Sequence, residues 1–168
     1  MFKQITRYFL VMLTVCSCNL YAQQDMNKAV VRISGEVAKP LALTKADLSK
    51  MKRITASIKD HDGKQIPYPG VAVQQILELA GVPTGKELRG KHLTKFLLVR
   101  STDGYRVVFS LAELDKGFND KTVILADESM KADLPAGKGP FRIIVPGEKV
   151  LARSSFGVSE LIVMSTAD

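Results

Sequence analysis

The sequence predicts a single α+β domain in which a mixed β-sheet is combined with short helices. Short apolar stretches, many of them alternating, recur along the chain and are separated by turn residues. Helical patterns are few and short, and they do not alternate regularly with the strands as in a wound βαβ sheet. The 168 residues contain no internal repeat. We therefore place one domain at residues 26–168.

Residues 1–22 carry the pattern of a secretory signal peptide. Lys3 and Arg7 precede an apolar run, and Ala22 supplies the small residue before the cleavage point. The run is shorter than the roughly 20 apolar residues that a transmembrane helix needs. We therefore expect a periplasmic or secreted protein with no transmembrane segment left after cleavage. A lipoprotein signal that ends at Cys18 is the alternative.

The cysteine count and the net charge exclude several classes of chemistry. Both cysteines, Cys16 and Cys18, lie within the predicted signal peptide. The mature domain is therefore expected to contain no disulfide, no thiolate nucleophile and no thiolate metal ligand. The net charge of +7 falls to +5 when Lys3 and Arg7 are lost with the signal peptide, because residues 1–22 hold no acidic residue. This excess favours anionic partners, and a solvated basic surface is the alternative. We expect no nucleic-acid partner, because the sequence shows neither an aromatic-basic RNA motif nor a recognition helix.

The first elements are predicted from apolar alternation and capping residues. Residues 30–37 alternate as in a strand. Thr44, followed by Asp47 three residues later, forms an N-cap pattern that opens a short helix. Residues 53–59 predict a second strand, which leads into a turn over 60–63.

The clearest helix is predicted over residues 71–80, after the Pro-Tyr-Pro-Gly sequence at 67–70. Its apolar residues fall on one face, and Gly81 supplies a C-terminal stop. Residues 96–99 and 105–109 then predict two strands joined through an Asp-Gly turn as a hairpin.

The rest of the chain predicts one more helix and three strands. Ser110 and Glu113 form a capping box that starts a short helix. The remaining strands are predicted over residues 122–126, 141–145 and 158–164.

The order of these motifs resembles that of a known family. The motifs are at residues 30–37, 40–44, 70–77, 101–105, 124–127 and 139–147. Together they are similar to the oxidoreductase molybdopterin-binding domain of the sulfite oxidase superfamily, especially its small stand-alone exported members. The resemblance implies an α+β domain that can cradle a pterin with a phosphate tail, which makes molybdopterin the cofactor to consider.

Two departures from the family pattern bear on function. In the catalytic members a cysteine thiolate holds the molybdenum, whereas the corresponding stretch here, residues 59–68, contains no cysteine. A thiolate anchors a high-valent metal through a soft, anionic sulfur, whereas an imidazole or a carboxylate is a harder ligand with a different charge. In the last cofactor-contacting segment Arg153 and Ser154 match, but Phe156 and Gly157 replace a lysine and a tryptophan. The resemblance therefore implies the fold without the family's metal chemistry.

Arg142 is the first candidate for ligand contact. It follows a Gly-Lys-Gly-Pro sequence that includes Lys138, and a guanidinium beside free backbone amides can bind a phosphate or carboxylate. The family pattern adds Arg153 and Ser154 to this cofactor-binding set. An arginine on the solvent face of a strand is the alternative for Arg142. Lys149 and Arg106 are weaker candidates for the same basic lining.

His61 completes the candidate set because it lies in the stretch where the family places its ligand loop. Asp60 and Asp62 flank it, and carboxylate neighbours can make a histidine a base or a metal ligand. The same residues are also the ordinary composition of a tight turn. One histidine without a second His or Cys nearby is a poor metal site. We therefore expect no metal site and no catalytic residue.

Two functions follow from these observations. The first is an exported, non-catalytic ligand-binding or accessory module whose partner is an anionic small molecule or a periplasmic redox protein. The second is a molybdopterin-dependent oxidoreductase that holds its cofactor without a thiolate ligand. The missing cysteine favours the first.

Overall fold

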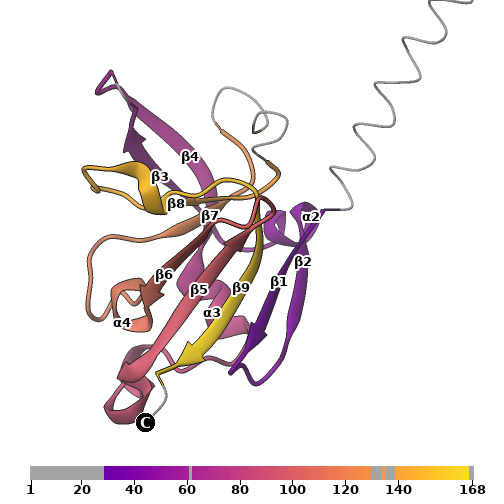
Figure 1. Cartoon of the computed structure of the whole chain (residues 1–168), viewed down its shortest axis with the longest axis vertical. Coiled ribbons are helices and arrows are strands. Elements are labelled where there is room, and N and C mark those ends of the chain that lie inside the picture. The colour runs from indigo at the N-terminus through magenta and orange to yellow at the C-terminus, as the bar shows by residue number, and fades with distance from the viewer. Residues whose placement is uncertain (1–28, 61, 130–133, 135–138, 167–168) are drawn as a thin grey trace, which may run out of the picture.

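The computed structural model describes residues 29–60, 62–129, 134 and 139–166, and it contains two β-sheets with short helices (Figure 1). The predicted α+β class is confirmed. The predicted signal peptide, His61 and Lys138 lie outside the described residues. Within the described ranges, no helix has both the length and the apolar character needed to cross a membrane.

The larger sheet, sheet A, has five strands in the order β2-β1-β9-β5-β6. Its strands are β1 (Val30–Gly35), β2 (Leu41–Thr44), β5 (Lys95–Ser101), β6 (Arg106–Ser110) and β9 (Val158–Ser165). β1 and β9 run parallel, whereas the other neighbours are antiparallel, so the sheet is mixed as predicted. The last strand of the chain therefore lies at the centre, beside the first strand.

The smaller sheet, sheet B, has four antiparallel strands in the order β3-β4-β7-β8. They are β3 (Arg53–Lys59), β4 (Gln65–Ala72), β7 (Ile124–Ala126) and β8 (Arg142–Ile144). The two edge strands, β3 and β8, also contact each other, so the sheet is curled. The long hairpin β3–β4 projects beyond the other two strands (Figure 1).

Short helices connect the strands. They are α2 (Lys45–Ser49), α3 (Val73–Leu79), α4 (Leu111–Leu114) and the 3₁₀ turns η1 (Gly85–Glu87), η2 (Gly90–Thr94) and η3 (Leu151–Arg153). Both predicted capping boxes are confirmed. Thr44 caps α2 together with Asp47, and Ser110 caps α4 together with Glu113.

Helix α3 starts later than predicted and ends where predicted. Residues 71 and 72 belong to β4, so the helix begins at Val73. At the other end the Gly81 N–H donates to the carbonyl of Glu78, and the Val82 N–H donates to that of Leu77. This pair of bonds is a Schellman motif, and it requires the positive φ of 73° that Gly81 adopts.

Strands β2 and β4 were not predicted, and β4 shows why. Proline is rare inside strands, so no strand was predicted over this stretch, yet Pro67 and Pro69 both lie within β4. The Asp60 N–H donates to Lys64 at the hairpin end, and antiparallel pairs alternate, so both prolines fall at non-hydrogen-bonded positions opposite β3. The nitrogens of both prolines face the other side of β4, toward β7. Strand β7 pairs only with residues 70–72 of β4, so the prolines cost the sheet no backbone hydrogen bond.

The buried apolar residues form two clusters. The main core joins the inner face of sheet A to α3 and to one face of sheet B, and it includes the fully buried Phe109 and Phe141. A second cluster lies inside the curl of sheet B. Its members are Ala56, Ile58, Tyr68, Ile124, Ala126, Leu134 and Ile144. This second cluster surrounds the first candidate residue.

Candidate functional site

Strand β8 places Arg142 inside the curl of sheet B, where 5% of it is exposed. Its Nη1 donates to the Tyr68 hydroxyl at 2.7 Å, and its Nε donates to the Ser154 carbonyl at 3.2 Å. The guanidinium carbon lies 3.7 Å from the centre of the Phe156 ring. Burial lowers the pKa of Arg142, but an arginine stays charged at neutral pH. No acidic residue in the described ranges pairs with it.

The register of sheet B makes room for this side chain. Arg142 lies opposite Ala126, which in turn lies opposite Gly70 on β4. These small residues leave space for the guanidinium to cross the sheet toward Tyr68. Gly70 is also required by close approach, because a Cβ there would lie 2.4 Å from the Leu125 carbonyl oxygen.

Ser154 is brought beside Arg142, but its hydroxyl is used by the backbone. The Val145 N–H donates to Ser154 Oγ at 3.0 Å. The Ser154 carbonyl accepts from Arg142. Ser154 therefore fastens the segment after η3 to β8, and Arg142 connects that segment with hairpin β3–β4 through Tyr68.

Arg153 points away from Arg142. Its Nη1 donates to Glu113 at 2.6 Å and its Nε to Glu148 at 2.8 Å. Its guanidinium carbon lies 4.7 Å from the centre of the Phe109 ring. Burial lowers the pKa of Arg153, but the bonds to Glu148 and Glu113 outweigh that effect and the pKa is raised overall. Two carboxylates thus neutralise a residue that the sequence placed in the ligand-binding set.

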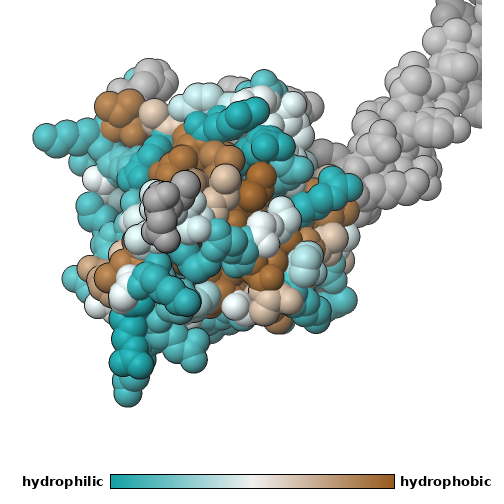
Figure 2. Space-filling view, turned by 60° about the horizontal axis from the view of Figure 1, so that its bottom comes forward, coloured by the Kyte–Doolittle hydropathy of each residue, from teal (hydrophilic) through white to brown (hydrophobic). Residues whose placement is uncertain are grey.

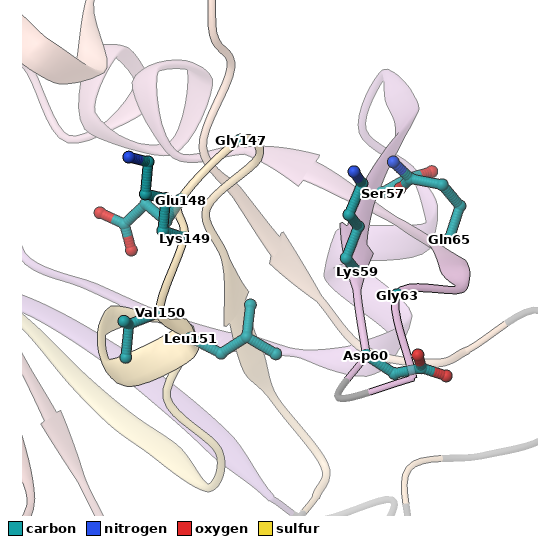
Figure 3. Close-up of a pocket in the computed structure, with 10 residues that line it drawn as sticks. All are labelled: Ser57, Lys59, Asp60, Gly63, Gln65, Gly147, Glu148, Lys149, Val150 and Leu151. Atoms are coloured by element: carbon teal, nitrogen blue, oxygen red, sulfur yellow. The ribbon is translucent and has the colours of Figure 1, made fainter.

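An open cleft of about 600 Å³ lies between hairpin β3–β4 and the loop that follows β8 (Figure 3). Its lining residues are Ser57, Lys59, Asp60, Gly63, Gln65, Gly147, Glu148, Lys149, Val150 and Leu151. The hairpin forms one wall and the loop forms the other (Figure 3). Lys149 was a weak candidate from the sequence, and the structure places it in this wall.

The lining contains two lysines and two acidic residues, and the two carboxylates are already engaged with other groups. Asp60 Oδ1 accepts from the backbone N–H groups of Asp62 and Lys64, at 3.0 and 2.8 Å. Glu148 is bound to Arg153. Neither Lys59 nor Lys149 forms an ion pair with the part of the chain that the structure describes.

The lining fits a ligand that is both charged and partly apolar. In Figure 3 Lys59 lies on the hairpin wall and Lys149 on the loop wall, and the Asp60 carboxylate lies at the opposite end of the hairpin wall from the Lys59 ammonium group. Ser57 and Gln65 supply a hydroxyl and an amide, whereas Val150, 72% exposed, and Leu151 supply apolar surface. The described residues contain no group of three or more His, Cys, Asp or Glu side chains that could hold a metal ion.

Comparison with known proteins adds one finding. No family model matches this chain, and no curated protein matches it either. The sulfane dehydrogenase SoxCD from Paracoccus pantotrophus has a similar solved structure, with a TM-score of 0.65 and 20% sequence identity. The likeness covers 84% of this chain and 39% of that one, so this chain spans about two-fifths of its length. This chain therefore shares its fold with part of that sulfane dehydrogenase.

The residues present do not fit a molybdopterin held in the way that the family resembled by the sequence would hold it. Residues 59–68 form a hairpin without cysteine. Arg153 is occupied by two carboxylates, and the Phe156 ring covers Arg142. Ligand contact by Arg142, Arg153 and Ser154 stays a prediction, as does that of His61 and Lys138.

Sequence reasoning missed Lys59 and Gln65 as lining residues. The turn over residues 60–63 was predicted, so both were known to flank a hairpin end. Nothing local in the sequence indicates that the loop at residues 147–151 lies opposite them, because that approach follows from the curl of sheet B.

Proposed function

We propose that this chain is an exported, non-catalytic ligand-binding module that holds an anionic small molecule in the cleft between hairpin β3–β4 and the 147–151 loop. One observation carries the proposal. Lys59 and Lys149 stand unpaired on opposite walls, while Asp60 and Glu148 are engaged with other groups.

The physical basis is the attraction of two ammonium groups for one anion. Charge-assisted hydrogen bonds from lysine to a carboxylate or phosphate are stronger than neutral ones. Val150 and Leu151 favour a ligand with an apolar portion, since pockets combine apolar surface with a few polar groups that fix orientation. Both lysines are exposed, so the affinity should fall as salt screens their charge.

Metal and pterin content separates this proposal from the oxidoreductase alternative. The chain is purified from the periplasm of a molybdenum-replete host, and bound molybdenum and released pterin are measured. We expect neither. Stoichiometric molybdenum would overturn the non-catalytic proposal and favour an enzyme that holds its cofactor without a thiolate.

Anion binding tests the cleft itself. Inorganic phosphate and a series of aliphatic and aromatic dicarboxylates are titrated at low salt by calorimetry. The Lys59→Gln/Lys149→Gln double variant should bind the best of these anions at least tenfold more weakly, a loss of about 1.4 kcal/mol or more. Lys86→Gln on η1, an exposed lysine outside the lining, is the matched control. Equal affinity in the double variant, or no binding by the unmodified chain, would exclude the cleft.

A further inference from the structure

The outer face of sheet A is ordered into rows by the register of its strands. Arg106, Arg100, Glu160 and Arg32 follow one another across β6, β5, β9 and β1 as a charged row. The next row along the strands contains Val108, Leu98 and Ile162, and it ends on β1 at Ser34. The row after that contains Phe96 and Met164.

The apolar residues of the second and third rows form a patch, which we define as Phe96, Leu98, Val108, Ile162 and Met164. Val108 is 48% exposed and Met164 is 40% exposed, and the other three are partly exposed. The solvent face of an antiparallel sheet is normally polar. Hydrophobic residues also reach the surface between hydrophilic ones in an oblique view of the molecule (Figure 2). An apolar patch with a charged margin is typical of a protein interaction site.

The charged row restricts what can cover this patch. Arg100 and Glu160 pair with each other at 2.7 Å. Arg32 and Arg106, at the two ends of the row, form no ion pair with any residue the structure describes. The row therefore carries two uncompensated positive charges on a chain whose net charge is +7. A second copy would bring like charges together, whereas acidic side chains would neutralise them.

We infer that the outer face of sheet A is the docking surface for a protein partner that has an apolar centre flanked by acidic residues. The partner's apolar side chains would cover Leu98 and Ile162, and its carboxylates would reach Arg32 and Arg106. Burial at the patch would supply most of the affinity, and the arginines would set orientation and association rate. No residue of the patch lines the cleft, so this inference and the proposed function stand or fall separately.

Site-specific photocrosslinking tests the inference. A photoreactive phenylalanine analogue replaces Val108 in the full chain, expressed in the organism that makes it, and crosslinked peptides are identified by mass spectrometry. The same analogue at Leu79 on α3, an apolar residue that is 50% exposed, is the matched control. We expect a crosslink from position 108 to one defined protein, at a peptide containing acidic residues, and none from position 79.

Charge reversal then tests the role assigned to the arginines. The Arg32→Glu/Arg106→Glu variant should lower the crosslink yield at least tenfold without changing the unfolding midpoint, because both side chains are exposed and unpaired. A crosslink to a second copy of the chain or to lipid would overturn the inference. So would an equal yield from position 79, no crosslink at all, or a yield that charge reversal leaves unchanged.

Discussion

At Arg142 a permanent charge is buried without a carboxylate among the described residues. Taking a guanidinium out of water is costly unless its donors are satisfied. Here Tyr68 and Ser154 each accept one bond, and the Phe156 ring offers its negative face. The same contacts connect hairpin β3–β4, which is one wall of the cleft, with Ser154, which closely follows the 147–151 loop that forms the other wall. Arg142 therefore positions the walls.

Substitution of Arg142 should reveal this positioning role. Arg142→Ala removes two hydrogen bonds and two ring contacts, so we expect a loss of about 2–4 kcal/mol in unfolding free energy, measured with denaturant. Arg142→Lys keeps the charge but not the planar geometry that serves both acceptors, so it should recover less than half of that loss. An unfolding midpoint unchanged in either variant would rule out the role.

Asp47 should make stability depend on pH in the acid range. Hydrogen bonds from the Thr44 hydroxyl and the Thr44 backbone N–H lower the pKa of Asp47 below its usual value of 3.8. A carboxyl whose pKa is lower in the folded than in the unfolded chain contributes stability above the unfolded value. That contribution disappears as the pH falls through the folded pKa.

The Asp47→Asn variant tests this dependence, with unfolding midpoints compared between pH 6 and pH 3. Asp47→Asn should lose less stability over that interval than the unmodified chain, because the titrating group is absent. Asp120→Asn, at an exposed position outside any helix or strand, is the control. Identical pH profiles for Asp47→Asn and the unmodified chain would contradict the prediction.

Among the elements, those with a clear local signal were predicted, and the two strands without one, β2 and β4, were not. Thr44 with Asp47 and Ser110 with Glu113 mark helix starts within four residues, and both helices form there. Strand β4 contains two prolines that locally favour a turn, and it is a strand only because β3 and β7 lie on either side. Strand β2 is short and pairs only with β1 among the described strands, so its own alternation is a weak signal.

The close approach of β4 and β7 predicts a strong effect of Gly70→Ala. The added Cβ would lie 2.4 Å from the Leu125 carbonyl oxygen and 2.8 Å from the Ala126 Cα, and backbone atoms cannot yield as a flexible side chain can. We expect a loss of about 1–3 kcal/mol in unfolding free energy from this overpacking. Gly63→Ala is the comparison, since its Cβ would be in open space and only its positive φ is strained. A smaller loss at Gly70 than at Gly63 would contradict the prediction.

At the scale of the whole molecule, the candidate site was predictable only in part. The basic residues were visible in the sequence, but their partners were not. Arg153 is bound to Glu113, which lies forty residues earlier and had been fully explained by its capping box. The cleft joins residues 57–65 to residues 147–151. Local patterns cannot predict such pairings, because they arise from the curl of sheet B and its packing against sheet A.

Arg153 is one of the contacts that join the two sheets. It connects the segment after β8 to α4 through Glu113 and to β6 through the carbonyl of Val108. Arg153→Met should keep much of the apolar contact with Phe109 but lose the ion pairs. Because the guanidinium is partly exposed, we expect a cost of only about 1 kcal/mol.

Amide hydrogen exchange should show where the Arg153→Met variant loses stability. In Arg153→Met the amides of residues 147–157 should exchange faster, while those of β5 and β9 should keep their protection. Unchanged exchange over residues 147–157 would show that the ion pairs do not hold this segment.

The central place of β9 in sheet A has a consequence for synthesis. β1 has β9 as a neighbour, yet about 120 residues are made between them. A nascent chain therefore cannot close sheet A until its last strand has left the ribosome. Until then β1 and β5 expose edges that β9 will later fill. Removing β9 would split the sheet into two hairpins, so synthesis through β9 precedes folding of this sheet.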